Sequence, residues 1–219
     1  MNWLSGHHLA LIAQGFLTTV VIVGLGFVLG TVGGLLLAAL KTAGPRPVRI
    51  LAAAYVEVIR NTPFLIQASL LFALMGVARI RVDPALLGTV SVALYVTAYM
   101  AEILRGALRT VPPGQAEAAR SLGLHRLAAF RLVTWPQLLP FALPAAANLL
   151  ATVAKESAFL SALSVAELTF AGQVLISQTF RVFEVWAIIG TLYLALILAL
   201  LALAARLECS FRWAQPRSS

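Results

Sequence analysis

The chain has 219 residues, of which 61% are hydrophobic and 11% charged, and this composition excludes an ordinary soluble globular protein. A membrane-spanning helix takes about 20 apolar residues, so the length allows about five spans and leaves little chain for a soluble domain. The net charge of +8 is spread over connections between apolar runs, which argues against a nucleic-acid-binding face. The single cysteine, Cys209, excludes an internal disulfide and a thiolate metal cluster. We therefore expect an all-α polytopic membrane protein, one transmembrane domain over residues 1–219, with no metal and no cofactor.

The first span is predicted at about residues 15–40, inside a stretch from 9 to 40 that contains no charged residue. Gly26, Gly30 and Gly34 recur every fourth residue and therefore share one helix face. Such a face lets a second backbone approach closely, as in helix-dimer motifs, although the same spacing also arises by chance among 15 glycines.

The second span is predicted at about residues 57–78, and its beginning is polar. Glu57 and Arg60 are three residues apart and can form an ion pair on one helix face or take part in gating. Pro63 disfavours helix at the residue before it. The alternative is therefore an interfacial helix over 48–60, followed by a span that starts near Pro63.

Three further spans are predicted at about residues 86–104, 137–155 and 185–205. Tyr99 lies in the first of these and is either an interface anchor or a substrate contact. The longest polar segment, residues 105–135, precedes the fourth span. That span carries three prolines at four-residue intervals, Pro136, Pro140 and Pro144, each of which removes a backbone donor.

The basic residues divide unequally between alternate connections, which predicts the orientation. One set holds eleven lysines and arginines: Lys41, Arg46, Arg49, Arg105, Arg109, Arg120, Arg126, Arg131, Arg206, Arg212 and Arg217. The other set holds Arg79, Arg81 and Arg181. Under the positive-inside rule, the N-terminus is outside, whereas the C-terminus and the 105–135 loop are cytoplasmic.

A short helix with small side chains is predicted inside this loop. Pro113 suits a first helical position, Glu117 is expected in the first turn, and Gly123 ends the helix. Ala116 and Ala119 share one face with Gly123 and give the helix low relief. The segment is either a docking surface for another protein or an ordinary amphipathic loop helix.

The same residues carry a family resemblance. The pattern Glu117-Ala118-Ala119-x3-Gly123-x9-Val133-x-Trp135-Pro136 resembles the EAA loop of permease subunits of bacterial ATP-binding cassette importers, which have Ile and Leu where this chain has Val133 and Trp135. Four segments are similar to the polar amino acid branch of that family: RNTPFLIQ at 60–67, AEILRGA at 101–107, KES at 155–157 and VAELT at 165–169. The chain departs from that branch at Asn61, where relatives usually have glycine, and at KESAF, where many have KDTSL.

The resemblance implies a type I ABC importer permease-like fold in the bacterial plasma (inner) membrane. It also implies that the coupling helix, through Ala116, Glu117, Ala118, Ala119 and Gly123, docks on a separate ATP-binding cassette ATPase subunit. The other implied partners are a second permease subunit, identical or a sister chain, and a periplasmic or extracellular substrate-binding protein. Neither lysine of the chain lies in a Gly-x4-Gly-Lys-Ser/Thr phosphate loop, so we expect a transport subunit without enzymatic activity of its own.

An amino acid that crosses the membrane needs fixed polar partners for its charges, so polar residues in or beside the spans are candidate path residues. Glu156 can bind an ammonium group and Lys155 a carboxylate or a helix end, although both also fit a charged span terminus. Gln67 and Asn148 either line the path or hold two helices together. Tyr99 and Ser157 complete the candidate path.

Two other functions remain open at this point. An ion-coupled secondary transporter would also bury charged residues, although such folds often consist of paired repeats and the chain shows no two halves. An intramembrane hydrolase would need a catalytic motif, and the chain has no Gly-x-Ser-x-Gly and no His-Glu-x-x-His. A non-transporting assembly subunit is a weaker third possibility.

Overall fold

The computed structural model describes residues 4–211, without the side chains of 209–211. Every regular element of this part of the chain is a helix, which confirms the all-α prediction. The helices are α1 (Gly6–Ala43), α2 (Arg46–Arg60), α3 (Phe64–Val77), α4 (Pro84–Thr110), α5 (Pro113–Ser121), α6 (Arg126–Ala129), the π-helix η1 (Phe130–Thr134), α7 (Trp135–Glu156), the 3₁₀ helix η2 (Ser157–Leu163), α8 (Leu168–Thr179) and α9 (Val182–Phe211). The side chain of Cys209 and the arginines Arg212 and Arg217 lie outside the described residues.

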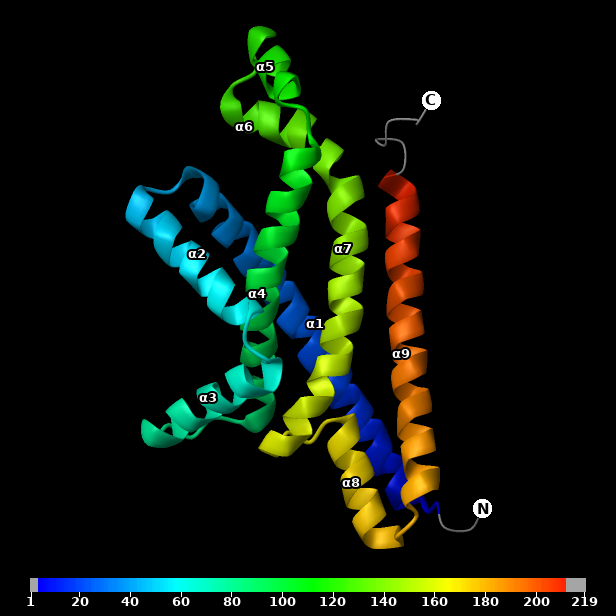
Figure 1. Cartoon of the computed structure of the whole chain (residues 1–219). Helices are drawn as coiled ribbons and strands as arrows, with labels where there is room; N and C mark the ends of the chain where they lie inside the picture. The colour runs from blue at the N-terminus through cyan, green and yellow to red at the C-terminus, as the bar shows by residue number, and fades with distance from the viewer. Residues whose placement is uncertain (1–3, 212–219) are drawn as a thin grey trace.

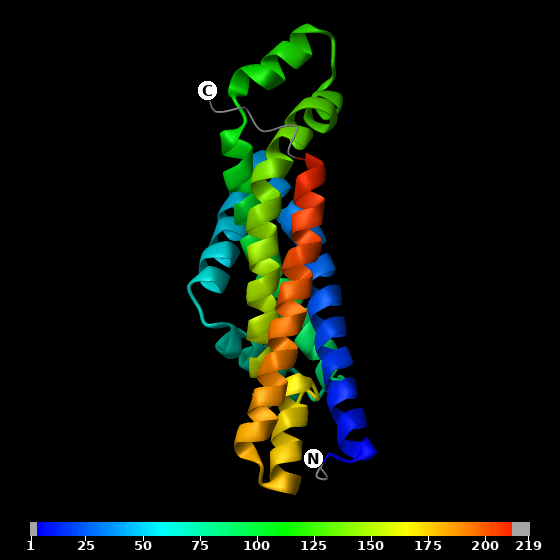
Figure 2. The same ribbon diagram turned by 90° about the vertical axis from the view of Figure 1, so that its right-hand side faces the viewer.

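Four helical stretches are long and apolar enough to cross a membrane, and the bent pair α2–α3 makes a fifth if it counts as one span. The four contain α1, α4, α7 and α9, which run along the length of the molecule (Figures 1 and 2). Helices α5 and α6 project at one end, and α8 lies at the other end. The expected number of about five spans therefore depends on the bent pair.

The predicted helix over 57–78 is interrupted at residues 61–63. The chain bends there by 112° between α2 and α3. Pro63 disfavours helix at the preceding residue, and Gln67 fixes the break by donating from Nε2 to the carbonyls of Ile59 (2.7 Å) and Thr62 (2.6 Å). Glu57 accepts from Asn61 Nδ2 at 3.1 Å, and Arg60 contacts Glu102 instead of Glu57. Of the two roles considered for Glu57 and Arg60, the ion pair between them is therefore not formed.

The glycine face of α1 packs against α4 of the same chain. A Cβ atom added to Gly26 would lie 2.4 Å from Val92 Cγ1, and one added to Gly30 would lie 2.5 Å from Val96 Cβ. At Gly34 the same test gives 2.6 Å to Met100 Cβ. The four-residue spacing therefore serves a close helix–helix contact within the chain.

A buried polar junction joins α8 to α1 and α9. Glu167 precedes α8 and caps it by accepting from the Phe170 amide at 2.7 Å and from the Tyr193 hydroxyl at 2.6 Å. Thr19 of α1 accepts from the Leu168 amide at 3.0 Å. Burial raises the pKa of the Glu167 carboxyl, and the hydrogen bond from Tyr193 opposes that rise. The VAELT segment thus has a structural role in fixing the start of α8.

The polar loop is shorter than predicted, because α4 continues to Thr110. Helix α5 begins at Pro113, as predicted, and Glu117 lies beyond its first turn, so the predicted first-turn position is wrong. The chain turns at Gly123 with φ of +86°. No heavy atom lies within 4 Å of a Cβ built on Gly123, so the backbone angle alone explains the glycine.

Alanine substitutions at two glycines of α1 are expected to change stability in opposite directions. Gly30→Ala places a methyl group against Val96 and should lower the stability of the fold by about 1–3 kcal/mol. Gly24→Ala meets nothing within 4 Å on the same helix and should stabilise by about 0.5–1 kcal/mol through the helix propensity of alanine. Thermal unfolding of the detergent-solubilised variants measures both, and equal midpoints would contradict the packing described.

Substitutions at Gly123 are expected to depend on backbone conformation rather than on size. Gly123→Ala should cost about 1–2 kcal/mol at a left-handed position, whereas Gly123→Asn should cost less because asparagine tolerates that region. Hydrogen exchange of the amides of residues 113–124 should therefore speed up more in the alanine variant. Faster exchange in the asparagine variant would show that side-chain volume decides instead.

Candidate functional site

The break between α2 and α3 opens a cavity of 680 Å³ against α4 and the end of α7. Two of the predicted path residues, Tyr99 of α4 and Glu156 of α7, line it together. The other lining residues come from the break itself, from α3, α4 and η2: Arg60, Asn61, Thr62, Pro63, Phe64, Leu65, Ile66, Tyr95 and Phe159. Segments that are far apart in the sequence therefore build one site.

One wall of the cavity is aromatic. The rings of Tyr95 and Tyr99 stack with their centroids 4.4 Å apart. Phe64 meets Tyr95 edge to face at 5.5 Å. Phe64 and Tyr95 are buried and fixed by this packing, whereas Tyr99 is partly exposed toward the cavity. The wall offers a flat aromatic surface with phenolic hydroxyl groups at the site.

Opposite charges lie on the cavity lining. Glu156 contributes a carboxylate, and Arg60 contributes a guanidinium whose Cζ atom lies 5.7 Å from the centre of the Tyr99 ring. The Tyr99 hydroxyl donates to the carbonyl of Arg60 at 3.4 Å and so ties the break to α4. A cavity with one carboxylate and one guanidinium can pair with both ends of a zwitterion.

The remaining predicted path residues lie elsewhere. Gln67 fixes the helix break, and Ser157 is fully buried, where its hydroxyl donates to the carbonyl of Ala154 at 3.0 Å. Asn148 and Lys155 are exposed on α7, and neither lines the cavity. A path role for these four residues stays a prediction.

Sequence reasoning missed the lining residues Phe64, Tyr95 and Phe159 and gave Arg60 only an ion pair or a gating role. Tyr95 lies four residues before Tyr99 and therefore one helical turn away on the same face, a spacing that could have identified the stacked pair. Phe64 and Phe159 gave no such signal, because phenylalanine in an apolar run is equally expected to face lipid.

A second charged cluster lies about one turn of α4 beyond Tyr99. Glu102 accepts hydrogen bonds from Lys41 of α1 and from Arg105 of α4, and its Oε2 atom lies 3.8 Å from Nη1 of Arg60. The side chains of Glu102 and Lys41 are only 12% and 14% exposed. One carboxylate thus holds the ends of α1 and α2 against α4, next to the projecting loop.

The projecting helix α5 shows a mostly open surface. Among the predicted coupling residues, Ala119 is buried, Ala116 is partly buried, and Glu117, Ala118 and Gly123 are exposed. Helix α5 packs against η1, in which the Trp135 amide donates to the carbonyl five residues earlier, at Phe130. The loop therefore connects to α7 through a π-helical turn, a type of helix that often occurs at functional sites.

Within residues 4–211, no three His, Cys, Asp or Glu side chains gather as a metal site.

Comparison with known proteins places this arrangement in a family. Residues 30–219 match the family described as "Binding-protein-dependent transport system inner membrane component". The chain is 34% identical to the glutamine transport system permease protein GlnP of Escherichia coli strain K12 over 200 residues, which cover 90% of this chain and 91% of that protein. It is 31% identical to the nopaline transport system permease protein NocM of Agrobacterium fabrum over 189 residues, covering 81% and 78% of the two chains.

Solved structures agree with these relatives. A crystal structure of an amino acid ABC transporter with histidines superposes with a TM-score of 0.85 at 33% identity and covers 93% of this chain and 95% of that one. An inward-facing MetNI methionine ABC transporter gives a TM-score of 0.82 at 20% identity, covering 95% and 99% of the two chains, and this likeness concerns the fold. The chain therefore belongs to the family of binding-protein-dependent transport system inner membrane components, which are polytopic permease subunits.

Proposed function

We propose that this chain is the membrane permease subunit of an ATP-driven ABC importer for polar amino acids or their derivatives. The observation that carries the proposal is that α4 and α7 both run between the cavity and the projecting α5–α6 segment (Figure 1). Helix α4 carries Tyr95 and Tyr99, and α7 ends at Glu156. The names of the relatives, a glutamine permease and a nopaline permease, support the substrate class.

The arrangement suggests how ATP hydrolysis elsewhere can act on the cavity. An ATPase subunit that moves α5 would push on both α4 and η1–α7, since α5 follows α4 after Thr110 and packs against η1. Both helices contribute residues to the cavity, so their relative movement would change the separation of Tyr99 and Glu156. Such a change can switch the cavity between open and closed states.

The charges of the cavity support a zwitterionic ligand. Glu156 would bind the α-ammonium group and Arg60 the α-carboxylate, while the ligand's side chain packs on Tyr95 and Tyr99. Transfer of an unpaired charge out of water is costly, so the site must supply both partners. Gln67 and Ser157 would act indirectly, by fixing the helices that carry this site, and Asn148 and Lys155 would contact the ligand elsewhere along its path.

The open side of the cavity supports a second permease subunit as a partner. Helix α3 carries exposed apolar side chains, among them Ile66, Leu70 and Leu74, that are 52–61% accessible. We propose that a second permease subunit closes this side, and that a substrate-binding protein delivers the ligand from outside the bilayer. The excess of basic residues at the α5 end supports a cytoplasmic position for that end, with the N-terminus outside.

A bulky residue on the exposed surface of α5 should uncouple the importer. Ala118→Trp should lower both amino acid uptake and ligand-stimulated ATP hydrolysis at least about tenfold, equivalent to about 1.4 kcal/mol of docking free energy. Ala118→Ser keeps a small side chain and serves as the matched control. The assay uses proteoliposomes that contain the permease, the ATPase subunit and the binding protein. Full ligand stimulation of ATP hydrolysis in the tryptophan variant would exclude α5 as the docking surface.

Loss of the Glu156 charge should reduce transport without affecting basal ATP hydrolysis. Glu156→Gln should lower uptake of radiolabelled L-glutamine or L-arginine at least about tenfold, because the ammonium group loses its charged partner. Glu156→Asp keeps the carboxylate and should retain most of the uptake. Unchanged uptake kinetics in the glutamine variant would exclude Glu156 from the ligand site.

A further inference from the structure

A second hollow, separate from the cavity, lies at the basic end of the molecule. It has a volume of 220 Å³ and is formed where the end of α1, the end of α4, η1 and the start of α7 meet. We call it the basic-end groove, and its lining is Leu35, Ala38, Ala39, Thr42, Leu104, Arg105, Leu108, Phe130, Trp135 and Leu138. The amino acid path proposed above does not use it.

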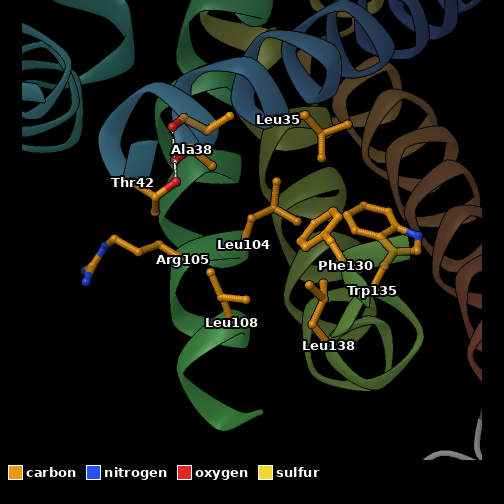
Figure 3. A pocket seen from close by; sticks show the side chains of 10 residues that line it. Leu35, Ala38, Thr42, Leu104, Arg105, Leu108, Phe130, Trp135 and Leu138 are labelled. Carbon is orange, nitrogen blue, oxygen red and sulfur yellow. Dashed lines mark hydrogen bonds between the residues drawn. The ribbon is translucent and has the colours of Figure 1, made fainter. Parts of the chain in front are cut away.

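The floor of the basic-end groove is hydrocarbon in character. Figure 3 shows Leu104 and Leu108 of α4 facing Phe130 and Leu138 across the groove. The Thr42 hydroxyl is directed back to its own helix, where it donates to the carbonyls of Ala38 and Ala39 at 3.0 Å. A molecule bound on this floor therefore contacts apolar groups. The volume of the groove is smaller than the range of about 300–1,000 Å³ that is typical of small-molecule sites. A single hydrocarbon chain suits this space better than a folded ligand.

The edge of the same groove is cationic. The Arg105 guanidinium points away from the apolar lining (Figure 3) and toward Glu102, which also binds Lys41 and lies near Arg60. Glu57 is a second carboxylate that acts electrostatically on Arg105. Lys41 and Arg105 balance these two carboxylates, and Arg60 is the cation proposed above to bind the ligand's carboxylate.

A further arginine makes the edge positive. Arg109 follows Arg105 by one turn of α4 and therefore shares its helix face, and its side chain is exposed. The groove thus joins an apolar floor to a positively charged edge at the end of the spans.

We propose that the basic-end groove binds an anionic phospholipid, with one acyl chain on the apolar floor and the phosphate at the edge near Arg105. Basic pockets between membrane helices on the cytoplasmic side are suited to anionic headgroups. The proposed orientation of the chain determines only which leaflet supplies this lipid. With the α5 end in the cytoplasm, that leaflet is the cytoplasmic one. It is independent of the transported ligand.

A lipid at this position would contact the joint between the coupling helices and α7. Phe130 begins η1, and Trp135 directly follows it, with their ring centroids 6.0 Å apart. An acyl chain packed between this pair and Leu104 would stabilise the π-helical turn against α4. Anionic lipid is therefore expected to affect how movement of α5 reaches α7.

Native mass spectrometry of the assembled importer tests the proposal directly. The complex is stripped of lipid in detergent and then titrated with phosphatidylglycerol or phosphatidylcholine, without ATP or amino acid. We expect one phosphatidylglycerol per permease chain, bound at least about fivefold more tightly than phosphatidylcholine, because each nearby basic residue favours the anionic headgroup. Equal binding of the two lipids would overturn the anionic preference.

A variant that fills the groove distinguishes lipid bound there from lipid bound elsewhere on the protein. Ala39→Trp places a large side chain on the groove lining and should abolish the specific binding of phosphatidylglycerol. Val28→Trp changes an equally lipid-accessible part of α1 outside the groove, where Val28 is 60% exposed, and should retain it. Retention of the lipid in the Ala39→Trp variant would overturn the site.

A cross-linking control distinguishes lipid from a protein occupant. If Ala39→Cys forms a disulfide-length cross-link to a second permease chain in the assembled importer, the groove is a protein interface and the lipid proposal is wrong. If instead the proposed function is wrong, the unaltered complex would show no amino acid uptake but would still bind phosphatidylglycerol.

Discussion

The fold depends on the close contact between α1 and α4. Gly26, Gly30 and Gly34 bring the two backbones so near that an added methyl group would meet Val92, Val96 or Met100 at 2.4–2.6 Å. In a membrane there is little hydrophobic driving force between helices, so van der Waals contact of this kind is a main source of cohesion. Helix α4, once fixed in this way, also packs against α2, α3 and α7 and becomes the central helix of the bundle.

The position of α4 explains why the two polar sites lie on one element. Tyr95 and Tyr99 face the cavity at the α2–α3 break, and Glu102 gathers Lys41 and Arg105 next to the basic loop. Charged side chains inside a membrane protein need partners, and each cluster supplies them from different helices. A shift of α4 would therefore change the cavity and the charged cluster together, and this is the physical basis of the coupling that we propose between an ATPase subunit and the ligand path.

Much of the helix pattern could be predicted because lipid imposes it. Uninterrupted apolar runs such as those of α1 and α9 need no tertiary information, and Pro63 marked the region where α2 ends. The 112° angle could not be predicted, since it depends on Gln67 reaching back to the carbonyl of Ile59 eight residues earlier. The glycine spacing was equally compatible with chance, a dimer and an intrachain contact until the partner helix was known.

The candidate site was predictable only where a polar side chain in or beside a span made a residue conspicuous. Glu156 and Tyr99 were predicted from the sequence and line one cavity. Phe64 and Phe159 look like ordinary lipid-facing residues until the α2–α3 break and the 3₁₀ helix η2, respectively, bring them to that cavity. Ser157 was predicted as a path residue because it is polar, yet its hydroxyl donates a hydrogen bond to a backbone carbonyl of the preceding turn. Glu117 was placed one turn too early, because the helix starts at Pro113 and its first turn ends before residue 117.

The most direct measurement concerns the side of the membrane on which α5 lies and what it touches there. Ala118→Cys in a Cys209→Ser background provides a single thiol on the exposed face of this helix. The account predicts that a short cross-linker joins this thiol to the ATPase subunit, and that an impermeant thiol reagent added to intact cells leaves it unmodified. Modification from outside the cell, with no adduct to the ATPase subunit, would contradict the account.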